Sequence, residues 1–163
     1  MNPDTPQWGP ALWRILHALV ERTGARTELR YAIDETRLWY GFLTGLRYAI
    51  PCTTCKTHYS EYILGHNIDP EFMKQGLDRR TGLRIWFYNF HQSVNGRTGK
   101  TFERPVDDLA TLYGREAYTD HMFVKDKDIL VENMRRAMFL QMMKRDDMLR
   151  AIRPLEELWL LTR

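Results

Sequence analysis

The sequence lacks a long apolar segment, a secretory signal and any block of like charge, and each absence excludes a class of protein. No apolar run approaches the roughly 18 residues needed to span a bilayer. Residues 1–6 lack the charged-then-apolar pattern of a signal peptide. Lys and Arg total 24 against 21 Asp and Glu, without a concentrated basic face. We therefore expect no membrane span, no export of the chain by itself and no nucleic acid partner, while the compartment stays unknown.

Strand-type alternation of apolar and polar residues is also missing, and apolar residues recur at helical spacing. The chain has 163 residues, 44% of them hydrophobic, which suits one domain or a small domain with an extension. The fold class predicted is all-α, a compact front bundle followed by a helical C-terminal addition. The expected helices cover residues 9–23, 28–49, 51–64, 79–98, 106–112, 127–150 and 155–161.

Proline and glycine mark the expected ends of these helices. Pro10 suits the first turn of a helix, and Pro154 is expected to break the long helix over residues 127–150. Gly24 and Gly99 are expected to stop the helices that precede them. Two further glycines, Gly41 and Gly45, weaken a helix but allow another helix or a flat ligand to approach closely.

Tryptophan and methionine are distributed unevenly along the chain. Four of the five Trp precede residue 100, whereas six of the eight Met follow it. Leu130, Met134, Met138 and Met142 stand four residues apart and so share one helix face. The interpretation favoured for this stripe is ordinary packing within the chain, and the alternative is a lid or a dimer surface.

The only two cysteines, Cys52 and Cys55, are separated by two residues at an expected helix start. They are close enough to form a small disulfide ring, and the helix dipole favours a thiolate there. Three other interpretations compete: reduced core thiols, half of a zinc site, and a thioredoxin-type motif. The thioredoxin interpretation fails because that motif needs a preceding strand in a βαβ unit.

A zinc site could take Cys52, Cys55 and His58 as three ligands. A structural site normally takes its fourth ligand from Cys or His at a recognisable spacing. Three other histidines would have to compete for the fourth position, and they stand at no such spacing: His17, His66 and His91. A small helical zinc-binding or scaffold protein is therefore the alternative hypothesis for function.

Aromatic residues accompany histidine and asparagine on two further helices. Trp13 and His17 lie one turn apart, and so do His91 and Asn95. Taken singly, each histidine is more often a hydrogen-bonded core residue than a ligand-binding one. Together, aromatic rings interleaved with polar edges suit a flat heteroaromatic ligand.

Three segments, in this order, resemble the ERV/ALR family of FAD-linked sulfhydryl oxidases. The family shows WGxxxWxxLH, PCxxCxxH[FY] and WxxxxHxxVNxxxGK motifs, which match residues 8–17, 51–59 and 86–100. The resemblance covers residues 8–103. It implies a four-helix bundle with a short fifth helix over residues 1–103 and a homodimer. The helical C-terminal addition indicated by periodicity then covers residues 104–163, as an extension that packs on the bundle or at a dimer interface.

The resemblance also implies the residues of the site, with FAD as the cofactor and no metal. Cys52 and Cys55 would be catalytic. The residues expected to bind FAD are Gly9, Trp13, His17, His58, Tyr59, His91, Val94, Asn95 and Lys100.

By this resemblance the activity is thiol oxidation, with electrons passing from the cysteine pair through FAD to oxygen, which gives hydrogen peroxide. Cellular members usually carry a second, shuttle cysteine pair, which this chain lacks. The expected partners are therefore thiol-containing proteins, reached directly or through a separate dithiol relay protein. Such minimal forms are similar to virus-encoded members, for which host cytoplasm or virion is the expected location.

Overall fold

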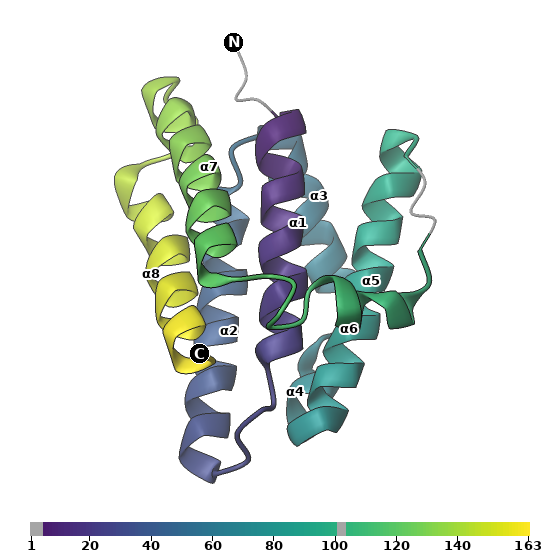
Figure 1. The fold of residues 1–163 in the computed structure, drawn as a ribbon. Helices are drawn as coiled ribbons and strands as arrows, with labels where there is room; N and C mark the ends of the chain where they lie inside the picture. Colours follow the sequence, from purple (N-terminus) through teal and green to yellow (C-terminus); the bar gives the residue numbers. More distant parts are fainter. Residues whose placement is uncertain (1–4, 101–103) are drawn as a thin grey trace.

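The computed structural model describes residues 5–100 and 104–163, and within them it is helical without strands (Figure 1). The all-α fold class is therefore confirmed. The elements are α1 (Thr5–Arg22), α2 (Leu29–Ala49), α3 (Thr53–Gly65), α4 (Asp69–Met73), α5 (Gly76–Thr98), the 3₁₀ turn η1 (Val106–Asp108), α6 (Leu109–Leu112), α7 (Asp120–Phe139) and α8 (Arg145–Leu161). The predicted domain boundary after residue 103 lies outside the described residues, and the division stays a prediction.

Helices α7 and α8 pack along α1 and α2, so the C-terminal part and the front bundle share one core (Figure 1). Fully buried side chains come from both parts: Ile15, Leu19, Trp39, Phe42, Leu46, Leu83, Phe87, Leu130, Met134, Leu155 and Leu158. Met134 belongs to this core, and Met138 and Met142 pack against it, in agreement with the interpretation of the stripe as internal packing. Each fully buried side chain of this size stabilises the fold by about 1.5–3 kcal/mol.

Gly41 and Gly45 let α8 approach α2. A Cβ atom on Gly45 would lie 2.7 Å from the carbonyl oxygen of Arg150 and 2.8 Å from the Cα of Ala151. A Cβ on Gly41 would lie 3.3 Å from Cγ of Pro154. The glycine spacing was expected to admit either another helix or a flat ligand, and in the structure it admits helix α8.

The single helix predicted over residues 127–150 is wrong, because the chain turns back between α7 and α8. Gln141 has a left-handed backbone (φ 60°) after the end of α7. The backbone N–H of Lys144 then donates to the Asp147 carboxylate at 3.0 Å, an N-terminal capping bond that begins α8. The four-residue apolar spacing continues through the turn, which is why periodicity alone missed it.

Two prolines predicted at helix boundaries lie inside helices. Pro10 is within α1, and Pro154 is within α8, so no separate helix begins at residue 155. An interior proline costs about 3 kcal/mol, and Leu155 and Leu158, both 0% exposed, supply compensating burial on α8. Short helix α4 was missed inside an expected connector, whereas the stops at Gly24 and Gly99 are confirmed by their positive φ angles of 76° and 74°.

Across the described ranges, no helix combines the length and the apolar character needed to cross a bilayer.

Candidate functional site

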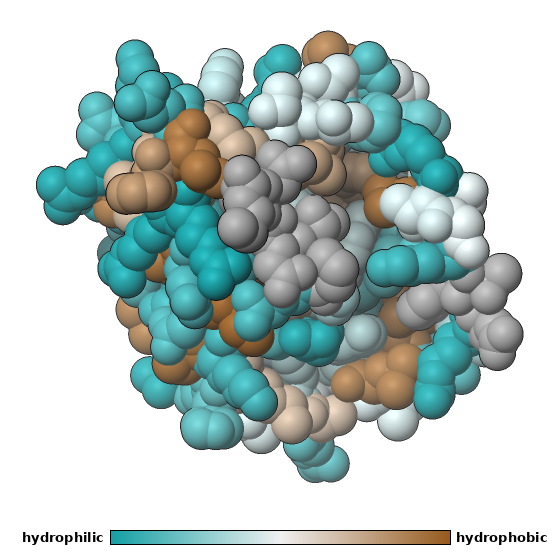
Figure 2. Space-filling model, turned by 90° about the horizontal axis from the view of Figure 1, so that it is seen from above, coloured by the Kyte–Doolittle hydropathy of each residue, from teal (hydrophilic) through white to brown (hydrophobic). Residues whose placement is uncertain are grey.

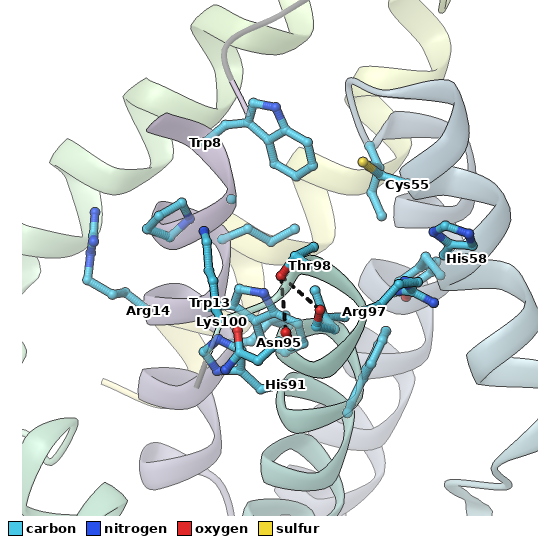
Figure 3. Close-up of a pocket in the computed structure, with 18 of the residues that line it drawn as sticks. Trp8, Trp13, Arg14, Cys55, His58, His91, Asn95, Arg97, Thr98 and Lys100 are labelled. Atoms are coloured by element: carbon cyan, nitrogen blue, oxygen red, sulfur yellow. Dashed lines mark hydrogen bonds between the residues drawn. The ribbon is translucent and has the colours of Figure 1, made fainter. Parts of the chain in front are cut away.

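A cavity of about 450 Å³ opens at one end of the bundle, between the first half of α1, the start of α3 and the end of α5 (Figure 3). This is the end of the molecule seen in Figure 2. Nine residues named from the sequence line the cavity: Gly9, Trp13, Cys55, His58, Tyr59, His91, Val94, Asn95 and Lys100. Three segments distant in sequence therefore converge on one space, and the remaining two residues named, His17 and Cys52, lie directly behind its lining residues.

Cys52 and Cys55 form a disulfide with Cα atoms 5.2 Å apart. Cys52 is the N-cap of α3, and its sulfur accepts a hydrogen bond from the backbone N–H of Cys55 at 3.2 Å. Cys55 lines the cavity, whereas Cys52 is not among the lining residues. The pair thus has an inner sulfur that faces the cavity and an outer one.

This geometry does not favour the zinc interpretation of Cys52, Cys55 and His58. Each sulfur is bonded to the other. Among the described residues, no group of three or more His, Cys, Asp or Glu side chains is arranged to hold a metal ion.

One wall of the cavity is a stack of rings from α1 and α5. The rings of Trp13 and His91 are nearly parallel, with centroids 4.1 Å apart and an angle of 4° between planes. Phe90 meets Trp13 edge-on, with centroids 5.2 Å apart and planes at 88°. Such pairs have well-defined relative orientations, so the wall presents aromatic ring faces and edges to the cavity.

His17 supports this wall from behind. Its Nε2 lies 2.9 Å from Nδ1 of His91. Burial, and then the neighbouring His91, lower the pKa of His17 to about 3. Burial, and then the charge of Lys100, lower the pKa of His91 to about 4. Both rings are therefore neutral at pH 7, one donating to the other, and the structure places His17 where it orients His91.

Tyr59 is fixed beside the cysteine pair. Its hydroxyl donates to the carbonyl oxygen of Leu43 on α2 at 2.6 Å. The side chain is 5% exposed, and burial raises its pKa far above the ordinary value. Its ring therefore offers a neutral, immobile surface to the cavity.

The cavity has cationic side chains and, among the described lining residues, no acidic one. Arg14 is neutralised, because its guanidinium donates to the buried Asp126 of α7 at distances down to 2.7 Å. Within the described residues, neither Arg97 nor Lys100 forms an ion pair. An anionic ligand would therefore meet two uncompensated positive charges.

Sequence reasoning did not assign a site role to several lining residues: Trp8, Pro10, Leu12, Arg14, Leu16, Ile50, Phe90, Arg97, Thr98 and Tyr113. Most of them stand within or next to the quoted motifs, so their positions on the same helix faces could have indicated them. Tyr113 is different. It follows α6 and stacks on His17, with centroids 5.2 Å apart, a contact that no local pattern predicts.

Comparison with known proteins agrees with the resemblance seen in the motifs. The model of the Erv1 / Alr family matches residues 10–111. A protein of Invertebrate iridescent virus 3 named "Putative FAD-linked sulfhydryl oxidase 096R" is 27% identical over 100 residues. The match covers 61% of this chain and 62% of that relative, so it spans less than two thirds of the viral protein. No solved structure matches the chain significantly.

Proposed function

Because the chain belongs to the Erv1/Alr family, we propose that it is a FAD-dependent thiol oxidase that forms disulfides in protein substrates. The net reaction converts two thiols and oxygen into a disulfide and hydrogen peroxide. One observation carries the proposal: a disulfide whose inner cysteine lines a cavity with aromatic and cationic side chains. The name of the viral relative supports the same activity.

The cavity fits the chemistry of FAD. Its volume of about 450 Å³ falls among those of small-molecule sites. The stacked rings of Trp13 and His91 suit a planar ring system, and the free charges of Arg97 and Lys100 suit the two negative charges of a pyrophosphate. The residues proposed to hold FAD are Gly9, Trp13, His58, Tyr59, His91, Val94, Asn95 and Lys100, with His17 orienting His91.

The two cysteines take different roles because only one of them faces the cavity. A substrate thiolate attacks Sγ of Cys52, the outer sulfur, and displaces Cys55 as a thiolate. The N-terminus of α3 stabilises the negative charge on that thiolate. A second substrate thiolate then attacks the substrate sulfur of the mixed disulfide, which releases the oxidised substrate and leaves Cys52 reduced.

When bound, FAD supplies the two-electron chemistry that links the reduced cysteine pair to oxygen. The protein's own contribution is position and exclusion of water. Tyr59 and Phe90 are buried and lie close to one another, with ring centroids 5.8 Å apart. Both rings line the cavity together with Cys55, so the space beside this cysteine has an apolar wall.

The partners belong to the proposal as well. Thiol-containing proteins would meet Cys52 directly or through a separate dithiol relay protein. A homodimer stays a prediction from the family resemblance, and since α7 and α8 cover faces of α1 and α2, a second copy would have to meet the chain elsewhere. A viral source, with host cytoplasm or virion as the location, also stays a prediction.

The test is reconstitution of the purified protein with FAD. We expect a yellow protein that consumes oxygen with dithiothreitol. Cys55→Ala should retain flavin and lose oxygen consumption, because the variant lacks the sulfur that lines the cavity. A protein that stays colourless after incubation with FAD would overturn the proposal, and about one zinc per chain in that preparation would select the alternative.

A further inference from the structure

A second, small cavity of about 10 Å³ lies where the C-terminal part meets the front bundle. Its walls come from the end of α1, the start of α2, the turn after α6 and the end of α8, which is marked C in Figure 1. The stretch of α1 from Gly9, in the larger cavity, to Arg22, in the smaller one, is about 20 Å long. The two cavities have no described lining residue in common. The small cavity is lined by Arg22, Ala25, Arg26, Tyr31, Glu35, Arg115, Leu161 and Thr162.

Three guanidinium groups give this small cavity a cationic lining, those of Arg22, Arg26 and Arg115. Arg26 lies over the ring of Tyr31, 4.6 Å from its centroid. Arg115 donates to the carbonyl oxygen of Thr162 at 2.6 Å. Neither Arg26 nor Arg115 forms an ion pair with any described residue. Both groups are therefore held at the cavity by contacts that do not neutralise their charge.

Arg22 carries a buried charge with weak compensation. The residue is 5% exposed, and its guanidinium lies over the ring of Trp159, 3.9 Å from the centroid. Among residues 5–100 and 104–163, its one ion pair is with Asp120 at 3.9 Å, and its buried Nε has no hydrogen-bond partner. The same exposed carboxylate binds Arg163 more closely, at 3.0 Å. Burial, and then the charge of Arg115, lower the pKa of Arg22. A buried cation in this position calls for a further counter-charge.

The one carboxylate among the described lining residues, Glu35, does not supply that charge. It accepts from the backbone N–H of Gly24 at 3.1 Å and from the guanidinium of Arg79, also at 3.1 Å. Arg79 and Glu35 are both buried and form an ion pair with each other. The charge of Glu35 is therefore already matched, and the cavity keeps a net positive lining.

We propose that this cavity binds a monatomic inorganic anion of the size of chloride, which neutralises Arg22, Arg26 and Arg115. Because Arg22 and Arg26 belong to the front bundle and Arg115 to the C-terminal part, the anion links the two regions. This inference does not depend on the proposed function.

The volume of the cavity decides the class of anion. A space of about 10 Å³ is close to the smallest that holds one water molecule, so it admits one atom of about that size. Chloride is only slightly larger than water, and guanidinium N–H groups donate to it readily. Arg26 and Arg115 are exposed, so they can adjust to an anion that arrives from solvent. A polyatomic anion such as sulfate is too large unless the surrounding side chains move.

The test is thermal denaturation of the purified protein in mixtures of sodium chloride and sodium gluconate at constant ionic strength. Gluconate is too large for the cavity, so only chloride should bind there. The Tm should rise with chloride and saturate, by about 3–6 °C at a chloride concentration about ten times the Kd. In Arg26→Gln and in Arg115→Gln, the chloride concentration that gives half of this rise should increase about ten-fold, because each variant lacks one charged donor.

Two control variants separate this cavity from general electrostatic effects. Arg30→Gln removes the same charge from an exposed residue at the start of α2 that does not line the small cavity, and it should keep the wild-type response. Lys100→Gln should keep the response as well, because Lys100 lines the larger cavity. Loss of the chloride response in Lys100→Gln, with the response retained in Arg26→Gln, would place the anion in the larger cavity and overturn the proposal.

Sodium sulfate tests the size of the site. Sulfate stabilises folded proteins through its exclusion from their surface, and this effect should be the same in the wild-type protein and in Arg26→Gln. With chloride, the wild-type Tm should instead rise more than that of Arg26→Gln. An equal difference between the two proteins in sulfate and in chloride would show that the arginines are merely screened. That result, or a full chloride response in both Arg26→Gln and Arg115→Gln, would overturn the site.

Discussion

The front bundle and the C-terminal part of the chain contribute to the site in different ways. The bundle supplies the cysteine pair and most of the cavity lining from α1, α3 and α5. The C-terminal part supplies partners to lining and neighbouring residues: Asp126 binds Arg14, and the carbonyl oxygen of Met142 binds Lys56. Chemistry is thus concentrated in residues with recognisable motifs, whereas residues without any motif hold the surrounding helices in place.

The largest expected effect tests whether these two regions share one core. Leu130→Ala on α7 removes a side chain that is 0% exposed. It should lower the free energy of unfolding by about 2–5 kcal/mol, because it leaves a cavity in the common core. Chemical denaturation should still show one cooperative transition for both regions. Two transitions, with only one shifted, would show that the C-terminal part folds independently.

The second effect lies within the bundle and follows from the neutral histidine pair. The folded-state pKa values of about 3 for His17 and about 4 for His91 lie below the ordinary value of 6.5. As the pH falls, both histidines therefore become protonated in the unfolded chain before they do so in the folded protein. The free energy of unfolding should decrease as the pH falls from about 6.5 towards 4, by up to about 1.4 kcal/mol per pH unit for each histidine.

This acid sensitivity can be measured by urea denaturation at a series of pH values. In His17→Phe the free energy of unfolding should decrease less steeply with falling pH below pH 6.5, since one of the two neutral imidazole rings is removed. The value at pH 8 serves as the internal reference. The same pH dependence of the free energy of unfolding in the variant and the wild-type protein would contradict the conclusion that both histidines are neutral in the folded protein.

The third effect tests the contact between the two regions. Gly45→Ala places a methyl group 2.7 Å from the backbone oxygen of Arg150, so α8 must move away from α2. We expect a loss of about 1–3 kcal/mol in the free energy of unfolding. Gly96→Ala is the matched control, because no atom lies within 4 Å of its added Cβ, and it should stabilise helix α5 by roughly 0.5–1 kcal/mol. Equal effects of the two variants would contradict the close packing.

The smallest effect concerns the link from α7 to the cavity. Asp126 accepts hydrogen bonds from the Arg14 guanidinium on both carboxylate oxygens and from the hydroxyl of Tyr118 at 2.7 Å. Asp126→Asn keeps the shape of the side chain, but it removes the negative charge and replaces one accepting oxygen by an NH2 donor. Thermal denaturation should show a loss of about 1–2 kcal/mol, since Arg14 is partly exposed. Asp120→Asn removes a carboxylate from the exposed start of the same helix and should cost less. A larger loss from Asp120→Asn would reverse this order.

Much of the bundle could be predicted from the sequence because its signals are local. Helical periodicity predicted α2 and α5, and glycine conformation predicted the stops at Gly24 and Gly99. The turn between α7 and α8 could not be predicted, because the apolar spacing runs through it and only the packing of α8 on α2 requires it. Pro154 was misjudged for the same reason, as its ring fits against Gly41.

The candidate site likewise combines residues that local motifs indicate with residues that only tertiary contacts bring there. Motif residues of three separate segments, among them Trp13, Cys55 and His91, line one cavity, and the roles that the family resemblance implies for them stay proposals. Tyr113 and the carboxylate of Asp126 could not be found this way, because both come from the C-terminal part and reach the site through tertiary contacts alone.

Anaerobic titration of the FAD-loaded protein with dithiothreitol tests most directly whether the cysteine pair communicates with a flavin in the cavity. We expect the flavin absorbance to bleach rapidly in the wild-type protein and to persist in Cys55→Ala on the same time scale. Equal bleaching in both proteins would show that electrons reach the flavin without the inner sulfur, and would contradict the role proposed for Cys55.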